Sequence, residues 1–314
     1  MTFPAPYRAR PARRDDLYDL VALFEARDRV DVGFIDPSRD EIVADWAVAR
    51  FDIDRDTIVA EAPDRTVAGY GLVLALDPTV QIFAMGRVHP EHAGRGLGSA
   101  MLGETERRAA LRLPSGVSAP FRTAMPSTDA AALELFVGRG YRHVRSFWHM
   151  QRGLPAADTP VDLPDGITLR LGASEGDELI AYRVLDEAFR DHFGYEPSEQ
   201  EEWLQEFRGM PGYDPSLIVL AFEGDEPVGV SVSMAADDGV GWVGDLGVRE
   251  PWRRRGVGRA LLTRSFAELA ARRHHEVRLG VDTENATGAT HLYSGVGMTV
   301  RRRYDLYEKQ LTGA

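Results

Sequence analysis

Residues 245–260 read DLGVREPWRRRGVGRA, and the rest of the chain is arranged around this stretch. An apolar strand containing Leu246 and Val248 is followed by a turn at Pro251, three arginines, two glycines and the start of a helix. Glycines at a helix start expose consecutive backbone N–H groups, and the helix dipole adds positive potential behind them. With the adjacent guanidinium groups, this pattern predicts a binding site for a phosphate ester.

The spacing of the glycines excludes two common nucleotide-binding motifs. A Walker A loop has four residues between its glycines and then Lys-Ser or Lys-Thr, and a Rossmann fingerprint has a third small residue. Here Leu261 occupies the position of that third glycine. An ordinary basic strand-to-helix turn remains the plain alternative to a binding loop.

The hexamer RRRGVG at 253–258 matches the pattern R-x-x-G-x-G and resembles the acetyl-CoA loop of the GNAT N-acetyltransferases. In that family the backbone amides of the loop hold the coenzyme A pyrophosphate, and the strand before it pairs with the pantetheine arm. The resemblance implies an α/β (α+β) fold, a mixed and mostly antiparallel sheet flanked by helices, with acetyl-CoA as co-substrate. It implies these coenzyme-binding residues: Leu246, Gly247, Val248, Arg253, Arg254, Arg255, Gly256, Val257, Gly258, Arg259 and Asn285.

A second motif of the same family follows at 285–298, NATGATHLYSGVGM, with Gly288 where the family usually has alanine. Asn285 is predicted to cap the helix and Gly297 to end it. The resemblance makes Tyr293 the candidate general acid, because a phenol near the coenzyme sulfur can protonate the leaving thiolate. The alternative for Tyr293 is a packed aromatic side chain with a solvated hydroxyl.

Length and charge narrow the class of protein. The chain has 314 residues, a formal net charge of −12 and no cysteine. The length predicts two domains of about 150 residues each. The charge argues against nucleic acid and is compatible with an amine substrate. Without cysteine there is no cysteinyl acyl-enzyme, so acyl transfer is expected to be direct or to use another nucleophile.

The sequence predicts neither a membrane span nor a metal site. No stretch approaches the roughly 18 apolar residues of a membrane span, and the amino terminus lacks an apolar signal region. A cytoplasmic location is therefore expected. His274 and His275 lack metal-ligand spacing with another histidine or acid, so no metal is expected.

The order of predicted elements occurs twice along the chain. Gly96 and Gly256 are about 160 residues apart, and Phe136 and Tyr293 about 157. This matched register indicates a duplication. The expected domains are a GNAT-like domain at 1–152, a proline-rich linker at 153–165, and a second GNAT-like domain at 166–314.

The two copies differ at the residues that carry chemistry. The first keeps Gly96 and Gly98, but Ala93 stands where the second has Arg253, and Phe136 where it has Tyr293. Phenylalanine has no proton to donate. The first domain is therefore expected to be catalytically degenerate and the second active.

The general base is less defined by the sequence. A substrate amine of pKa ~10 is mostly protonated at neutral pH. Family members often place a glutamate early in the strand before the loop, but that position falls on or beside Trp242 here. Asp245, nearer the loop, is the first substitute. Deprotonation through water, and His192 as base, remain alternatives.

In this family the first two helices largely determine the acceptor. In the second copy that region includes His192 and Tyr195 among several carboxylates, and these two residues are predicted to line an acceptor pocket. A solvated charged loop over packed aromatics is the alternative. The resulting hypothesis is an N-acetyltransferase acting on a primary amine of a small molecule. A non-catalytic acyl-CoA sensor and a protein or peptide N-acetyltransferase are the competing functions.

Overall fold

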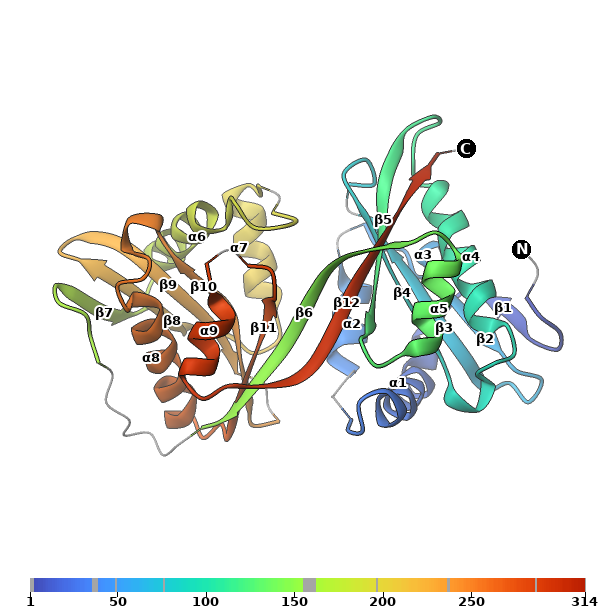
Figure 1. Ribbon diagram of the computed structural model, residues 1–314, viewed down its shortest axis with the longest axis horizontal. Coiled ribbons are helices and arrows are strands. Elements are labelled where there is room, and N and C mark those ends of the chain that lie inside the picture. The colour runs from blue at the N-terminus through green and yellow to red at the C-terminus, as the bar shows by residue number, and fades with distance from the viewer. Residues whose placement is uncertain are drawn as a thin grey trace. The chain divides into compact units, whose positions relative to one another are not determined.

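A computed structural model describes residues 3–35, 39–48, 50–75, 77–154, 162–195, 197–235, 238–285 and 287–313, without the side chains of residues 40 and 41 (Figure 1). The chain divides into two compact units. Unit 1 comprises residues 1–147 and 302–314, and unit 2 comprises residues 148–301. Within the described ranges, no helix is long and apolar enough to cross a membrane.

Unit 1 has helices on both faces of a sheet. Its strands are β1 (Arg8–Arg10), β2 (Thr57–Glu61), β3 (Val67–Leu74), β4 (Ile82–Val88), β5 (Ser118–Pro126), the first half of β6 (Arg142–Gly153) and most of β12 (Thr299–Thr312). Its helices are α1 (Leu17–Asp31), α2 (Arg39–Ala47), α3 (Ile53–Asp56), α4 (Leu97–Ala110) and α5 (Ala130–Gly138), with short 3-10 turns at Arg14–Asp16 and Pro90–His92.

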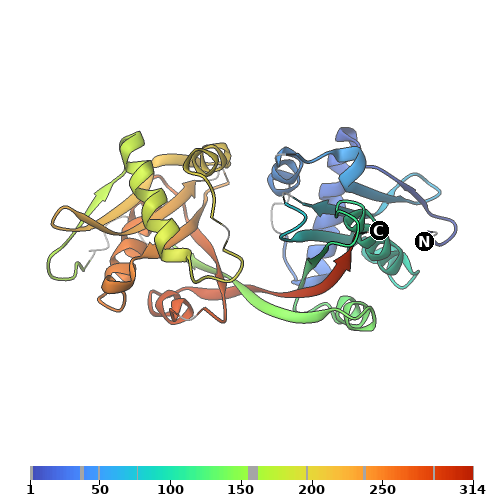
Figure 2. The same cartoon turned by 90° about the horizontal axis from the view of Figure 1, so that it is seen from above.

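Unit 2 repeats this order. Its strands are the second half of β6, then β7 (Ile167–Leu171), β8 (Tyr213–Glu223), β9 (Glu226–Ala235), β10 (Val240–Val248) and β11 (Glu276–Asp282). Its helices are α6 (Glu175–Phe189), α7 (Gln200–Gly209), α8 (Val257–Ala271) and α9 (Ala289–Gly295), with a 3-10 turn at Glu250–Trp252. Figure 2 shows α6 and α7 on one face of the unit 2 sheet and α8 and α9 on the other.

The unit 2 sheet buries an apolar core on each face. One core joins α6 and α7 to β8 and β9, and the other joins α8 and α9 to β10 and β11. Strands β7, β8, β9 and β10 pair antiparallel in sequence order, whereas β10 and β11 are parallel. The sheet is therefore mixed and mostly antiparallel, which confirms the predicted fold class.

The last strand of each repeat crosses into the other unit. Residues Tyr304–Thr312 of β12 pair antiparallel with β5 in unit 1, and the buried Tyr307 joins the unit 1 core. Reciprocally, residues 148–153 of β6 belong to unit 2, where Met150 is fully buried. The compact units thus differ from the expected ranges 1–152 and 166–314, because the chain exchanges its final strands. Residues 155–161 of the expected linker lie outside the described part of the chain.

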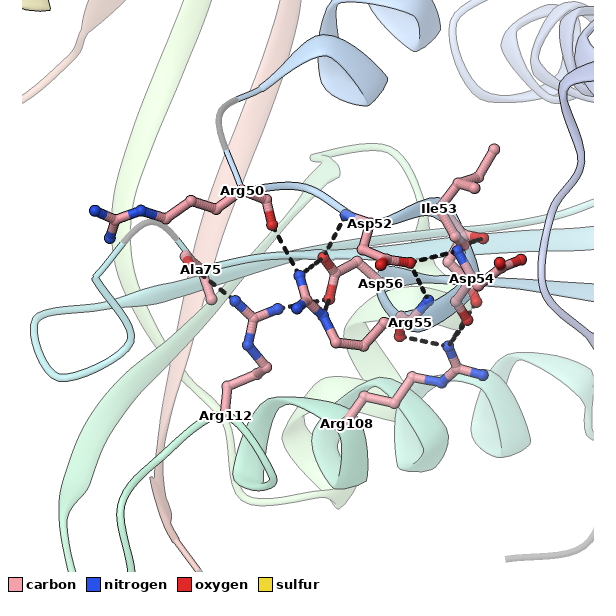
Figure 3. A network of polar contacts seen from close by, with 10 residues as sticks. Arg50, Asp52, Ile53, Asp54, Arg55, Asp56, Ala75, Arg108 and Arg112 are labelled. Carbon is pink, nitrogen blue, oxygen red and sulfur yellow. Dashed lines mark hydrogen bonds and ion pairs between the residues drawn. The ribbon is translucent and has the colours of Figure 1, made fainter.

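Equivalent arginine contacts brace both units at positions 160 residues apart, an ion pair in unit 1 and a hydrogen bond in unit 2. In unit 1, Arg112 at the end of α4 contacts the buried carboxylate of Asp56 at 2.6 Å, within the network shown in Figure 3. Arg55 contacts the same carboxylate at 2.6 Å. In unit 2, Arg272 follows α8 and its guanidinium donates to Ser216 Oγ at 2.7 Å. The repeated contact supports the duplication inferred from the sequence.

Candidate active site in unit 2

The loop between β10 and α8 has the geometry of an anion cradle. Gly256 adopts φ 87° and Arg254 φ 61°, both in the left-handed region, so the chain turns sharply into the helix. Among the described residues, no protein group accepts a hydrogen bond from the backbone N–H groups of residues 254–259. These N–H groups at the positive end of a 15-residue helix are suited to a diphosphate.

Arg253 braces this loop against its neighbours. Its Nε donates to the carbonyl oxygen of Val248 at 2.9 Å, and its Nη2 donates to the carbonyl oxygen of Ala188 at 3.0 Å. One guanidinium therefore joins the end of β10 to the last turn of α6. Unit 1 has Ala93 at this position and cannot form this brace.

The other predicted arginines lie around the rim of the loop. Arg255 forms an exposed ion pair with Glu223 at 2.5 Å, and Arg259 donates to the carbonyl oxygen of Gly295 at 3.3 Å. Arg254 is exposed and has no hydrogen-bond or ion-pair partner in the part of the chain that the structure describes. Arg254 is therefore the rim cation most available to a bound anion.

Strands β10 and β11 separate before the loop. Their parallel pairing ends at Val243 opposite Leu279, although β10 continues to Val248 and β11 to Asp282. Pairing with β9 continues to the end of β10. Leu246, Gly247 and Val248 therefore lie on a stretch that is paired on one side only, as predicted for residues that bind an extended acyl-carrier arm.

A β-bulge at Gly244 decides which way Asp245 points. Val243 lies opposite Ser233 on β9, whereas Asp245 lies opposite the very next residue, Val232. The extra residue reverses the alternation of side chains, because successive residues of a regular strand point to opposite faces. Val232 belongs to the core under α6, so Asp245 also faces α6 and α7.

Asp245 and Tyr293 form the centre of the site. Asp245 is half-buried, and burial raises the pKa of its carboxyl group to about 6, with a contribution from the negative charge of Glu206 on α7. Tyr293 is 8% exposed, and burial together with the charge of Asp245 raises the pKa of its phenol to about 12. Among the described residues, neither side chain has a hydrogen-bond or ion-pair partner.

These pKa values suit complementary proton transfers. At neutral pH the Asp245 carboxylate is ionised and is more basic than an ordinary aspartate, while the Tyr293 phenol is fully protonated. Two titratable groups whose surroundings set them in opposite protonation states define an acid and a base. The two residues that the sequence proposed for catalysis therefore lie close enough for the charge of Asp245 to act on the Tyr293 phenol.

His192 and Asn285, far apart in sequence, meet beside the loop. The Asn285 side-chain oxygen accepts from the backbone N–H of Thr287 at 2.8 Å, which orients Nδ2 toward His192 Nε2 at 2.9 Å. His192 Nε2 is then the acceptor, so the proton lies on Nδ1. Burial lowers the pKa of His192, and the imidazole is neutral at pH 7.

The helix that carries Tyr293 begins later than the sequence predicts. Asn285 was expected to be its N-cap, but α9 starts at Ala289 and its N-cap is Gly288, with φ 74°. The prediction was wrong because Asn285 hydrogen-bonds to Thr287 instead, forming a separate turn before the helix.

Tyr195 lies in a different environment from His192. Its hydroxyl donates to the carboxylate of Asp186, which also contacts Arg190 at 2.7 Å. The phenol is thus held on the solvent side of α6. The backbone N–H of Tyr195 donates to the carbonyl oxygen of His192 at 3.1 Å, but the two side chains have different partners, Asp186 for Tyr195 and Asn285 for His192.

Two parts of the site were missed by sequence reasoning. Glu206 lies near Asp245 and has no ion-pair partner among the described residues, but nothing in the sequence of α7 distinguishes it from its neighbours. The bulge did have a signal, since an isolated glycine inside a strand pattern favours a bulge, and Gly244 precedes Asp245 directly. No group of three potential metal ligands occurs in the described ranges.

Comparison with known proteins defines the class. The sequence profile of the acetyltransferase (GNAT) family matches residues 178–298, the part of unit 2 that contains the loop and Tyr293. A GCN5-related N-acetyltransferase from Sphaerobacter thermophilus is 34% identical and has a TM-score of 0.86, with 100% of this chain and 98% of that chain covered. This chain belongs to the GCN5-related N-acetyltransferase (GNAT) family and is an acetyl-transferring enzyme.

Among its relatives are mycothiol acetyltransferases. The protein from Streptomyces scabiei is 31% identical over 251 residues, which cover 78% of this chain and 77% of the relative. The protein from Thermobispora bispora is 32% identical over 222 residues, covering 68% and 70%. A tandem GNAT protein from the clavulanic acid biosynthesis pathway, at 15% identity and a TM-score of 0.72, shares the fold over 98% of this chain and 99% of that chain.

Proposed function

We propose that unit 2 transfers an acetyl group directly from acetyl-CoA to the primary amine of a small molecule, with Asp245 as general base and Tyr293 as general acid. The observation that carries the proposal is the bulge at Gly244. It directs the Asp245 carboxylate to the face below α6 and α7 at the place where β10 leaves β11.

The free amides of the cradle support acetyl-CoA as the donor. Six consecutive backbone N–H groups and the exposed Arg254 match the charge of a diphosphate, and Gly256 lets the chain approach closely. The one-sided pairing of Leu246 to Val248 leaves backbone groups for the amides of an extended arm. Acetyl-CoA supplies the activated acyl group as a thioester.

In the proposed reaction Asp245 and Tyr293 each transfer one proton. The Asp245 carboxylate takes a proton from the substrate ammonium, and the free amine attacks the thioester carbon. As the carbon–sulfur bond breaks, the Tyr293 hydroxyl gives its proton to the sulfur. The acylated nitrogen loses its second proton to solvent, and solvent returns the proton held by Asp245 to Tyr293, so that one proton is released for each acetyl group transferred. A phenol with a pKa near 12 stays protonated until the thiolate develops.

The acceptor belongs to the small-molecule class on the strength of relatives named mycothiol acetyltransferase. The acceptor of this chain is open to test, because Trp242 stands at the position where the family often has a glutamate. The acceptor can be identified by incubating the protein with acetyl-CoA and each member of a panel of amines and peptides, and measuring release of the coenzyme thiol. Activity with peptides alone would contradict the proposal.

Tyr293→Phe tests the proposed acid. General acids contribute about 10²–10⁴-fold to rate, so kcat is expected to fall by about 10²-fold while acetyl-CoA affinity stays unchanged. Calorimetric titration of acetyl-CoA into the full chain supplies the affinity. An acyl-CoA sensor would bind acetyl-CoA without turnover, both as the unaltered chain and as Tyr293→Phe. Unchanged transfer in Tyr293→Phe would show that Tyr293 is not the general acid.

A further inference from the structure

The bulge at Gly244 also sets the position of Trp242. Trp242 lies opposite Met234 on β9, and Asp245 lies opposite Val232. Directly opposite residues of antiparallel strands point to the same face, and residues two apart on β9 do so as well. Trp242 and Asp245 therefore share the face below α6 and α7, separated by about 7 Å along the strand.

The side chains around Trp242 are an aromatic ring, His149, and a thioether, Met234. The indole ring meets the imidazole of His149 edge to face, with 5.3 Å between the ring centroids and an interplanar angle of 82°. Met234 covers the exposed Gly244, because a Cβ there would lie 2.3 Å from the Met234 methyl group. His149 lies similarly beside the exposed Gly280 of β11, at 3.8 Å from such a Cβ. Trp242, Met234 and His149 are all half-exposed, and we call them the Trp242 platform.

Charge near the platform is arranged to receive one ammonium group. Asp245 and Glu206 have no counterion among the described residues. The neighbouring cation, Arg278, donates from Nε to Glu276 at 2.5 Å and is neutralised there. A ligand that lies on the platform and reaches Asp245 therefore meets an apolar surface followed by a carboxylate.

We propose that the acceptor is an arylalkylamine, a primary amine joined by a short alkyl spacer to an aromatic ring, and that Trp242 is the residue that selects it. The inference rests on the proposed function and specifies its substrate class. Indole faces and thioethers favour contact with another aromatic ring. The spacing from Trp242 to Asp245 matches a short spacer between that ring and the reacting nitrogen.

The experiment compares two amines of nearly the same shape, tryptamine or 2-phenylethylamine against 2-cyclohexylethylamine, with glucosamine and spermidine as further acceptors. Steady-state kinetics are measured with the full chain, Trp242→Phe and Trp242→Leu, and thermal unfolding confirms that each variant is folded. Aromatic pairs are expected to favour the aryl acceptor by about threefold to tenfold in kcat/KM. Trp242→Phe keeps this ratio, whereas Trp242→Leu abolishes it through KM with little change in kcat.

Each result separates the inference from the proposed function. Equal turnover of phenyl and cyclohexyl acceptors, an aryl preference that survives Trp242→Leu, or a preference for glucosamine or spermidine overturns the inference while acetyl transfer stands. If no amine is acetylated, the proposed function fails, and calorimetric binding of tryptamine in the presence of coenzyme A then decides the platform alone. Binding that is lost in Trp242→Leu supports it, and absence of binding to the unaltered chain overturns it.

Discussion

Units 1 and 2 have the same arrangement of helices and strands but differ in the side chains of the strand before the cradle loop. Arg10 pairs with Asp16 at 2.6 Å in unit 1, and Arg170 pairs with Asp177 at 2.6 Å in unit 2, each tying a first strand to the start of the following helix. The cradle glycines match as well, with φ 79° at Gly96 and 87° at Gly256. These contacts hold the helices and strands in place, and both copies retain them.

The strand before the cradle is where the copies separate. In unit 1 the β3–β4 ladder is regular, so β4 has no bulge, and Met85 occupies the position that Asp245 has when counted from the loop glycine. Arg87, at the position of Gly247, lies 4.6 Å from the Phe24 ring and 3.4 Å from Asp28. Unit 1 therefore has a buried ion pair, Arg87 with Asp28, next to this strand. Unit 2 instead has the carboxylate of Asp245, which has no ion-pair partner among the described residues.

This difference teaches that the loop alone does not make the site. Among the described residues, the backbone N–H groups of both loops, 94–99 and 254–259, have no acceptor, but only in unit 2 does the strand before the loop carry a carboxylate whose charge acts on a nearby phenol, that of Tyr293 on α9. In unit 1 the equivalent of Tyr293 is Phe136, which packs against Tyr141 and Tyr307 with ring centroids 5.4 and 5.6 Å apart. On the proposed function, we infer that the extra strand residue and the two polar groups distinguish a catalytic copy from a structural one.

The largest effect is expected from Asp245→Asn, which should reduce kcat/KM by about 10³-fold because general bases contribute 10²–10⁴-fold. The same change should stabilise the fold by up to about 3 kcal/mol at neutral pH, since a pKa near 6 means that ionisation of Asp245 is costly in the folded state. Steady-state kinetics and urea unfolding measure both. Met85→Leu is the matched control in unit 1. A similar loss of activity in that variant would contradict the claim that only the unit 2 strand takes part in the reaction.

The next effect concerns pH. Protonation of Asp245 should lower kcat/KM about tenfold for each pH unit below about 6, and Asp245→Asn should lack this inflection. Because the folded pKa is raised above the unfolded one, the wild-type fold gains stability as pH falls from about 6 toward 4. Glu206→Gln removes a neighbouring negative charge and should move the inflection to lower pH. An inflection at the same pH in Glu206→Gln would show that the charge of Glu206 does not affect the pKa of Asp245.

A smaller effect is expected from alanine at the two cradle glycines. A left-handed conformation costs an L-residue about 1–2 kcal/mol, so Gly256→Ala should raise the KM for acetyl-CoA about tenfold. Gly96→Ala carries the same backbone strain in unit 1 and should leave that KM unchanged. Equal changes in KM from both substitutions would show that the first loop takes part in catalysis.

The smallest effect distinguishes the two arginine contacts, that of Arg112 in unit 1 from that of Arg272 in unit 2. Arg112→Ala withdraws one partner from the buried Asp56 and should cost about 2 kcal/mol of unfolding free energy, since Arg55 still pairs with that carboxylate. Arg272→Ala removes contacts to Ser216, to the partly exposed Asp214 and to Glu268 one turn earlier in the chain, and should cost less than about 1 kcal/mol. Urea unfolding measures both, and equal losses would contradict the different burial of the two braces.

Much of the fold was predictable because local patterns determine it. The motif at 245–260 predicted a strand with Leu246 and Val248 and a helix that begins at the glycines, and β10 does end at Val248 and α8 does begin at Val257. The loop geometry followed from this motif, and the short helix that carries Tyr293 followed from the second motif at 285–298. These features depend on residues close together in sequence, where the hydrophobic period and helix-capping chemistry act directly.

The remaining features depend on contacts between distant segments. No local pattern shows that Asn285 prefers a turn with Thr287 to capping a helix, or that its amide meets His192 across 93 residues. The exchange of final strands was also hidden, because β6 and β12 look like ordinary last strands of their own repeats. The choice between partners of equal local quality depends on tertiary packing, which sequence periodicity does not encode.

The exchanged strands affect how this protein is made and how it can be divided. Unit 1 lacks the strand beside β5 until residues 304–312 have been synthesised, although nearly all its other elements come first along the chain. During translation the first repeat therefore emerges with an unpaired sheet edge, and such edges invite association with other chains. For the same reason a gene cut at the repeat boundary encodes two incomplete sheets. The whole chain is therefore the smallest segment that encodes two complete sheets.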